Sequence, residues 1–330
     1  MVLHPFYSIT SSNVRKWVDF IHSFSHHFKY RTFALRALSM SHKSGFVNIV
    51  GSPNVGKSTL MNRLVGERVS IVTSKAQTTR HRIIGIVNED DIQVVFSDTP
   101  GVVNSAYKLH DNMMDSVQGS IKDADVLLFV TDTKERQMNH IKTLDRIKKL
   151  SVPVFCLINK IDLSSQDEVF KRIEYWQAQL PNAKVCPISA LHDFNVGELW
   201  EEIVKHIPES PPYYDKDDLT DRPLRFFISE IIREKIFELC QKEIPYSCQV
   251  LVEEYKEEER IIRIRAQIIV ERDSQKGIII GRRGDMLQKI GKKSRIDLEK
   301  FLDKKVFLEN YVKVDKDWRS SEQKLKKYGY

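Results

Sequence analysis

Between positions 46 and 207 the chain alternates short apolar runs with stretches that are apolar at every third or fourth residue. Runs rich in Val, Ile, Leu and Phe predict strands buried on both faces, and the intervening stretches predict amphipathic helices. This alternation predicts an α/β fold with a doubly wound, mostly parallel sheet, in which ligands bind at the carboxyl ends of the strands. We expect strands at Phe46–Val50, Ile83–Val87, Ile92–Asp98, Val126–Thr131, Val154–Asn159 and Lys184–Pro187.

The pattern changes after residue 208. The sequence Glu-Ser-Pro-Pro-Tyr-Tyr-Asp-Lys-Asp-Asp cannot continue a helix, and we interpret 209–221 as a linker between a first domain, 40–208, and a second, 222–330. The second domain has the predicted order α-β-β-α-α-β, which indicates an α+β fold. Its expected elements are a helix at Leu224–Glu243, strands at Cys248–Glu254 and Ile261–Glu271, a helical pair around Gly281, and a strand at Val306–Val314.

The sequence Gly-Ser-Pro-Asn-Val-Gly-Lys-Ser lies at 51–58, between the first predicted strand and a helical pattern. Glycines allow backbone amides and the start of a helix to face an anion, and a lysine adds positive charge for the β- and γ-phosphates. The serine that follows can ligate Mg²⁺. The segment therefore predicts a nucleoside triphosphate site made of Gly51, Ser52, Pro53, Asn54, Val55, Gly56, Lys57, Ser58 and Thr59.

Two further segments extend the predicted phosphate and metal site. The motif Asp98-Thr99-Pro100-Gly101 ends a predicted strand, where the carboxylate can join the Mg²⁺ shell and the Gly101 N–H can meet a γ-phosphate. The polar loop 75–81 precedes it and can supply a threonine hydroxyl to Mg²⁺. From the residues alone, either Thr78 or Thr79 fits this role.

The next motifs indicate the base. Asn159-Lys160-Ile161-Asp162 follows another strand, and the Asp162 carboxylate can accept hydrogen bonds from the exocyclic amine and ring N–H of guanine. Adenine offers no such pair of donors, so the site is expected to select GTP over ATP. Ser189 and Ala190 follow the last strand and suit a backbone contact to the guanine oxygen.

Composition limits the function classes. Hydrophobic residues make up 41% and charged residues 29%, and no run approaches the roughly 20 apolar residues of a membrane-spanning helix, so we exclude an integral membrane protein. The four cysteines share no metal-ligand or redox spacing, which favours a reducing, cytosol-like compartment. The net charge is +7, and in 276–330 sixteen Lys or Arg face eight acidic residues. This concentration indicates a polyanionic partner.

The motifs, taken in order, resemble those of the Era GTPases, in the TrmE–Era–EngA group of translation-associated GTPases. The resemblance covers about 40–330 and implies a P-loop GTPase that hydrolyses GTP to GDP with Mg²⁺. It also implies Thr79, just before the arginine of the switch loop, as the Mg²⁺ ligand beside Ser58 and Asp98. The matching segments are Gly-x-Pro-Asn-Val-Gly-Lys-Ser at 51–58, Lys-Ala-Gln-Thr-Thr-Arg-His at 75–81, Asp-Thr-Pro-Gly at 98–101, Asn-Lys-Ile-Asp at 159–162 and Ile-Ser-Ala at 188–190.

One departure from Ras-like enzymes bears on hydrolysis. Val102 follows Gly101, where those enzymes place a glutamine that orients water. A valine cannot polarise water, so catalysis is expected to rest on charge positioned around the phosphates. The family resemblance implies that Asn54 holds a potassium ion that acts much like an arginine finger, and the alternative is that Asn54 only caps the turn. The catalytic candidates are Lys57, Asn54, Thr79 and Gly101.

A second motif, the G-x-x-G loop of KH modules, lies at 281–284 between two helical segments. Its glycines let the backbone lie close to a sugar-phosphate chain, and the element order predicts the type II KH topology. Four unpaired nucleotides are expected between this loop and the 261–271 strand. The candidate RNA-binding residues are Gly281, Arg282, Arg283, Gly284, Lys289, Lys292 and Lys293, and the candidates for an apolar floor, with core packing as the alternative, are Ile278, Ile280, Leu287 and Ile290.

The resemblance implies a GTP-hydrolysing switch that binds small-subunit ribosomal RNA near its 3′ end and acts in processing and assembly of the small ribosomal subunit. A second hypothesis is a peripheral membrane or cell-cycle regulator whose basic domain docks on anionic lipid or protein. The basic but non-amphipathic C-terminal region favours RNA. We expect a cytoplasmic monomer, with weak peripheral association at the inner membrane surface as a further option.

Residues 1–39 stand apart, with five Lys or Arg, one acidic residue and no glycine. Three interpretations are open: a transit peptide, which would make the protein mitochondrial; a flexible, disordered basic arm; or non-native sequence upstream of a start at Met40. We favour the last, because Met40 lies just before the strand that leads into the phosphate loop.

Overall fold

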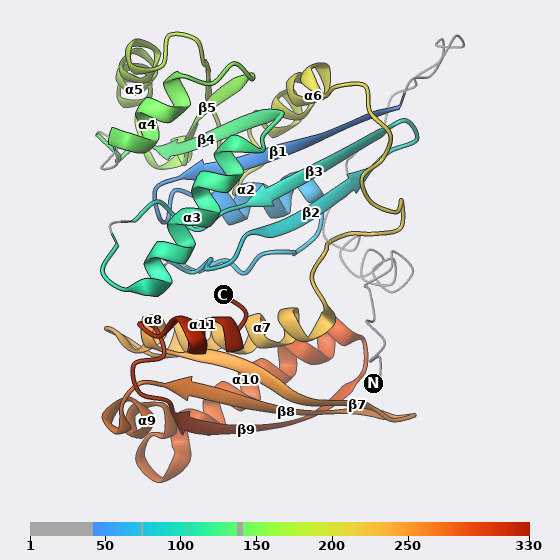
Figure 1. Cartoon of the computed structure of the whole chain (residues 1–330), viewed down its shortest axis with the longest axis vertical. Helices are drawn as coiled ribbons and strands as arrows, with labels where there is room; N and C mark the ends of the chain where they lie inside the picture. The colour runs from blue at the N-terminus through green and yellow to red at the C-terminus, as the bar shows by residue number, and fades with distance from the viewer. Residues whose placement is uncertain (1–41, 74, 104, 137–140) are drawn as a thin grey trace. The chain divides into compact units, whose positions relative to one another are not determined.

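The computed structural model describes residues 42–73, 75–103, 105–136 and 141–330 (Figure 1). It divides into two compact units, the first holding 42–106 and 110–221, and the second 222–330 with Tyr107–Leu109. The interpretations of 1–39 and of a start at Met40 lie outside the described residues.

The described part of the first unit contains a six-stranded sheet with the order β2-β3-β1-β4-β5-β6. β2 pairs antiparallel with β3, and the other neighbours pair in parallel, so the prediction of a mostly parallel sheet is confirmed. Only the ends of some strands differ from the expected ones. For example, β1 begins at Lys43 instead of Phe46. The strands are β1 Lys43–Gly51, β2 Ile83–Asn88, β3 Ile92–Asp98, β4 Val126–Asp132, β5 Val154–Asn159 and β6 Lys184–Pro187.

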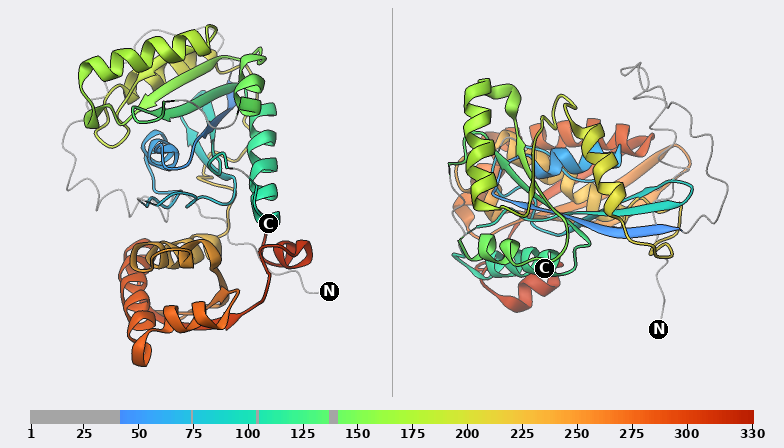
Figure 2. Two further views of the ribbon diagram at one scale, coloured as in Figure 1. Left: turned by 90° about the vertical axis from the view of Figure 1, so that its left-hand side faces the viewer. Right: turned by 90° about the horizontal axis from the view of Figure 1, so that it is seen from above.

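Helices cover both faces of this sheet, and the left view of Figure 2 shows α2 and α3 on opposite sides. On the α3 side, a core that includes Phe129 and Trp176 packs with the two rings edge-on, 5.2 Å apart. On the α2 side, Trp200 of α6 lies 6.1 Å from the ring of Phe96. Burial on both faces explains the continuous apolar runs of the strands. The helices are α2 Lys57–Val65, α3 Lys108–Lys122, α4 Ile141–Lys148, α5 Gln166–Gln179 and α6 Val196–His206, with a short 3₁₀ turn, η1, at Ile161–Leu163.

Residues 209–221, expected as a linker, lie against the sheet of the first unit. The Tyr214 amide donates to Gln93 Oε1 at 3.0 Å, and the Ile86 amide of β2 donates to the Leu219 carbonyl at 2.8 Å. The prolines stop a helix, but they leave an extended chain able to hydrogen-bond along the edge strand of a sheet. This segment, predicted as a linker between the two domains, is therefore also a structured part of the first unit.

The second unit has an α+β fold, as predicted. Its described residues form a three-stranded sheet in which β7 pairs antiparallel and β9 parallel with the central strand β8. One apolar core joins the sheet to three helices. The strands are β7 Gln249–Glu257, β8 Ile261–Val270 and β9 Lys305–Val314, and the helices are α7 Leu224–Leu239, α9 Asp273–Ile280 and α10 Asp285–Leu302.

Short elements complete this unit: α8 (Ile244–Ser247), the 3₁₀ turn η2 (Arg282–Gly284) and α11 (Glu322–Lys327). The first helix ends at Leu239 instead of Glu243, and Pro245 lies in the first turn of α8. The strand β7 continues to Glu257 instead of ending at Glu254. None of the helices in the described ranges is long and apolar enough to cross a membrane.

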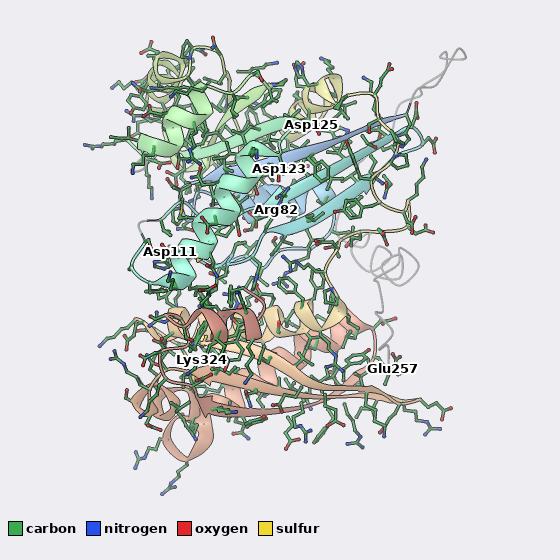
Figure 3. The ribbon with its side chains drawn as sticks, viewed as in Figure 1. Arg82, Asp111, Asp123, Asp125, Glu257 and Lys324 are labelled. Atoms are coloured by element: carbon green, nitrogen blue, oxygen red, sulfur yellow. The ribbon has the colours of Figure 1, made fainter. Side chains whose placement is uncertain are left out.

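The C-terminal residues form a helix that is packed onto the second unit. Trp318 is fully buried, donates its Nε1–H to the Ser247 carbonyl at 3.1 Å, and meets the Tyr328 ring edge-on at 5.8 Å. The ammonium of Lys324, labelled in Figure 3, and the Tyr328 hydroxyl both donate to the Asp315 carboxylate. Residues 318–330 are therefore a packed part of the second unit.

Candidate functional site

The predicted phosphate loop connects β1 to α2 and turns at Gly56, which has φ 98°. A Cβ atom at Gly56 would lie 2.2 Å from Asn159 Nδ2, so a larger residue would clash as well as strain the backbone. The loop, the start of α2 and part of the 75–81 loop line one cavity. Predicted site residues among its lining are Pro53, Asn54, Gly56, Lys57, Ser58, Thr59, Thr79, Gly101 and Lys160.

The Lys57 side chain is held beside the loop. Its ammonium donates to the Ser52 carbonyl at 2.8 Å, and the residue is 6% exposed. Burial lowers the pKa of Lys57 to about 8, although the nearby carboxylates of Asp98 and Glu135 oppose that change. An anionic ligand would restore the preference for the charged ammonium.

The three predicted metal ligands come together at the end of β3. Ser58 Oγ donates to Asp98 Oδ2 at 2.6 Å, Thr79 Oγ1 donates to the same oxygen at 3.3 Å, and the two hydroxyls are 3.0 Å apart. Asp98 is fully buried, and its Oδ1 has no hydrogen-bond partner among the described residues. Burial raises the pKa of Asp98, against the effect of Lys57 and the hydroxyls. A hard-oxygen set with an unpaired carboxylate oxygen fits Mg²⁺.

The two candidate threonines of the switch loop have different surroundings. Thr78 Oγ1 donates to the Lys75 carbonyl at 2.9 Å and lies 2.7 Å from Thr73 Oγ1, within its own loop. Thr79 faces Ser58 and Asp98. The geometry therefore brings Thr79, and not Thr78, to the metal site.

The predicted base-binding motifs also converge. Asp162 Oδ1 accepts from Ser189 Oγ at 2.6 Å, which fixes the orientation of the carboxylate. The Asn159 side chain connects two loops. Its Nδ2 donates to the Val55 carbonyl at 2.8 Å, and its Oδ1 accepts from the Ala190 backbone amide at 3.0 Å. Asn159 thus ties the phosphate loop to the base-binding loop, and the Ala190 N–H that we expected at the guanine oxygen donates to Asn159.

Three further residues considered in the sequence are Val102, Thr99 and Gly101. Val102 is 3% exposed, and its side chain packs in the core beside α3. Thr99 Oγ1 donates to the Ile49 carbonyl at 2.8 Å and braces the start of the Asp98 motif. A Cβ atom at Gly101 would lie 2.7 Å from Pro53 Cα, so the two loops touch there.

Two acidic residues beside the phosphate loop were missed from the sequence, Asp132 and Glu135. Asp132 Oδ2 pairs with the Lys160 ammonium at 3.1 Å, and Glu135 accepts a hydrogen bond from the Ser52 hydroxyl. Burial raises the pKa of Glu135, opposed by the hydroxyls of Ser52 and Thr131. Their place directly after an apolar strand was the available signal, because strand ends in such sheets face the ligand.

In the second unit, the G-x-x-G loop has the backbone its glycines predict. Gly281 and Gly284 have φ 76° and 85°, and Arg283 between them has φ 55°. A Cβ atom at Gly281 would lie 2.2 Å from Asp285 Oδ1, whereas none of the described atoms lies within 4 Å of one at Gly284. Arg282, Arg283, Lys289, Lys292 and Lys293 are all exposed on the loop and on α10.

The structure bears on two details of the expected RNA surface. The strand predicted to face the RNA, β8, is the middle strand of the sheet and is paired on both sides, whereas β9, which lies beside α9 and α10, is an edge strand. Ile290 is fully buried in the core and Ile280 and Leu287 pack against it, whereas Ile278 is 49% exposed. Helical spacing alone could not separate these roles.

The fold and the site define the class of protein: a P-loop GTPase domain followed by a KH domain. Two family models support this, one described as "50S ribosome-binding GTPase" that matches residues 46–160, and one described as a KH domain that matches 243–319. GTPase Era of Geotalea daltonii is 45% identical over 289 residues, covering 87% of this chain and 97% of that protein. GTPase Era of Staphylococcus haemolyticus is 43% identical over 293 residues, 88% and 97% respectively. The chain belongs to the Era family of GTPases.

Two solved structures are similar to this chain over both units. Era in complex with MgGDPNP and nucleotides 1506–1542 of 16S ribosomal RNA is 40% identical, with a TM-score of 0.83 over 88% of this chain and 99% of that one. A variant of Aquifex aeolicus Era bound to GDP·AlF4⁻ is also 40% identical, with a TM-score of 0.83 over 87% of this chain and 99% of that one.

Proposed function

We propose that this protein is a GTP-hydrolysing switch that binds small-subunit ribosomal RNA near its 3′ end and acts in processing and assembly of the small ribosomal subunit. One observation carries the proposal. The chain resembles, over 88% of its length, an Era structure that holds both MgGDPNP and a segment of 16S ribosomal RNA. The geometry of the nucleotide site is compatible with the first of these ligands, and the G-x-x-G loop is compatible with the second.

At the nucleotide site, Lys57 contacts the β- and γ-phosphates, and Ser58, Thr79 and Asp98 hold Mg²⁺. When bound, Mg²⁺ neutralises charge that develops on the phosphate oxygens. Asp162, held by Ser189, accepts the amine and ring N–H of guanine. The hydrogen bonds already present among these side chains support the assignment, because the groups need little rearrangement to receive the nucleotide.

Hydrolysis in this scheme depends on positioned charge. The buried Val102 side chain is unable to orient water. Asn54, which is exposed at the cavity and has φ 63°, is placed to help hold a potassium ion near the phosphates. GTP hydrolysis should then be faster in KCl than in NaCl, and equal rates in the two salts would remove the potassium ion from the scheme.

RNA binding is assigned to the second unit. The amides of the 281–284 loop and the exposed side chains of Arg282 and Arg283 would hold the sugar-phosphate backbone, with Lys289, Lys292 and Lys293 extending the positive surface along α10. The γ-phosphate would couple the units, because Thr79 and Gly101 contact it only in the GTP state and would order the switch loops.

Crosslinking in cells followed by RNA sequencing tests the partner. We expect the wild-type chain to recover the 3′ region of small-subunit ribosomal RNA. Gly284→Asp should lose the RNA while keeping GTP hydrolysis, because it places a carboxylate where a phosphate would lie; Lys57→Ala should lose nucleotide binding. Recovery of no ribosomal RNA, with binding to anionic vesicles instead, would replace this function with that of a peripheral membrane regulator.

A further inference from the structure

The turn after β4 contacts the phosphate loop through residues that do not line the cavity. Glu135 lies at the centre of this contact. One carboxylate oxygen accepts the Ser52 hydroxyl, and the other accepts Thr131 Oγ1 at 2.7 Å. Both Ser52 and Glu135 are only partly exposed, so water competes little for these hydrogen bonds.

The position of Glu135 is itself fixed by a neighbour. Asp132 Oδ1 accepts the backbone amides of Lys134 and Glu135 at 3.1 and 3.0 Å, which closes the turn. Asp132 Oδ2 pairs with the Lys160 ammonium at 3.1 Å, and that ammonium also donates to the Asn54 carbonyl. The turn therefore holds the phosphate loop at two points. Glu135 holds the Ser52 side chain, and Asp132 holds the Asn54 carbonyl through Lys160.

The contact of Glu135 with Ser52 bears directly on phosphate binding. The carbonyl of Ser52 accepts the Lys57 ammonium at 2.8 Å, so one residue connects Glu135 to the lysine that would contact the phosphates. Residues 52–56 form a loop without regular pairing, and each additional fixed point lowers the entropy that the loop loses when it closes around a ligand.

We propose that Glu135 is a positioning residue that holds Ser52, and through it the phosphate loop, in the conformation that binds nucleotide, and that this contact sets the residence time of bound GDP. The inference rests on the proposed function, since it assumes that guanine nucleotides occupy this loop. Glu135 is not among the residues that line the cavity, so its proposed role is to act through Ser52 and not on the reacting atoms.

Release of a fluorescent GDP analogue, followed by stopped flow, tests the proposal. Glu135→Ala should release the nucleotide roughly tenfold faster, the effect expected for losing one hydrogen bond to a charged acceptor. Ser52→Ala removes the same hydrogen bond from the other side and should give a similar increase. The double variant should be no faster than either single variant, because both remove one interaction.

Two further variants separate positioning from a general loss of structure. Glu135→Gln keeps an acceptor for the Ser52 hydroxyl and should restore a rate within about threefold of the wild type. Glu202→Ala is the matched control: Glu202 pairs with Lys184 and Lys205 on the same unit but is not part of this contact, and its loss should leave release unchanged.

The results distinguish this inference from the function on which it rests. Failure of the wild-type chain to bind the GDP analogue would overturn the proposed nucleotide site. Binding by the wild type, with release from Glu135→Ala and Ser52→Ala at the wild-type rate, would overturn only the positioning role. Rates that multiply in the double variant would also overturn it. If Glu135→Ala does not fold, release from Ser52→Ala at the wild-type rate decides against the proposal.

Discussion

Removing the Asn159 side chain should destabilise the first unit and weaken nucleotide binding. Asn159 is 2% exposed, and its amide joins the carbonyl of Val55 to the amide of Ala190. Asn159→Ala leaves one buried acceptor and one buried donor without their partner. The phosphate loop and the base-binding loop also lose the bond that holds them together.

The magnitude follows from the two groups left without a partner. Each buried polar group that loses its hydrogen bond costs about 1–3 kcal/mol, so the loss of two should lower the free energy of unfolding by roughly 2–6 kcal/mol. For a domain of this size, each 1 kcal/mol changes Tm by roughly 2–4 °C, which gives a decrease of roughly 4–24 °C. Asn159→Asp keeps an acceptor for Ala190 but places a carboxylate against the Val55 carbonyl, so it should not restore stability.

The assay is thermal unfolding of the full chain, monitored by circular dichroism, beside titration with a fluorescent GDP analogue. Asn182→Ala is the matched control, because Asn182 is exposed on the same unit and its loss should change stability by less than about 0.5 kcal/mol. A Tm for Asn159→Ala within about 1 °C of the control, with unchanged GDP affinity, would refute the reasoning.

Other predictions concern specificity, pH and salt. Asp162→Asn should weaken GDP binding at least about 100-fold and strengthen xanthosine diphosphate binding, because the new amide can donate to the xanthine C2 oxygen; competition titrations measure both. Burial raises the pKa of Glu67 from 4.5 to about 7, so the folded state binds more protons than the unfolded state between these values. The free energy of unfolding should therefore fall by roughly 1 kcal/mol from pH 4.5 to 7, a figure already lowered for solvent screening of this partly exposed group. Urea unfolding at several pH values measures this change, and Glu67→Gln should flatten it. Replacing Lys292 and Lys293 by alanine should lower the slope of log affinity for single-stranded RNA against log salt by about 0.7 for each phosphate that is no longer neutralised, whereas an unchanged slope would place RNA elsewhere.

Much of the fold was predictable because strong local signals agree with the tertiary structure. The β5 strand was predicted to the residue, since Val154–Asn159 is a continuous apolar run that ends at a polar motif. The contacts of segment 209–221 with the sheet were not predictable, because proline and acidic residues indicate where a helix stops and carry little information about hydrogen bonds to a distant residue such as Gln93.

The candidate site also has features that the sequence predicts and features that depend on tertiary contacts. Ser58 and Asp98 were predictable because both belong to motifs with fixed chemical roles, and they lie in contact. The bridging role of Asn159 and the contact of Glu135 with Ser52 depend on loops brought together from separate strands. Period alone places Ile278 and Ile290 on helices, but which side of each helix faces the core decides that the first is exposed and the second is buried.

The central claim is that the nucleotide at the first unit controls RNA binding at the second. Its most direct test is the affinity of the full chain for an oligonucleotide of the small-subunit ribosomal RNA 3′ end, measured by fluorescence anisotropy at fixed salt with a non-hydrolysable GTP analogue and with GDP. We predict at least roughly tenfold tighter binding with the GTP analogue, equivalent to about 1.4 kcal/mol of coupling, and no such difference for a scrambled oligonucleotide. Equal affinity in the two nucleotide states would contradict the account.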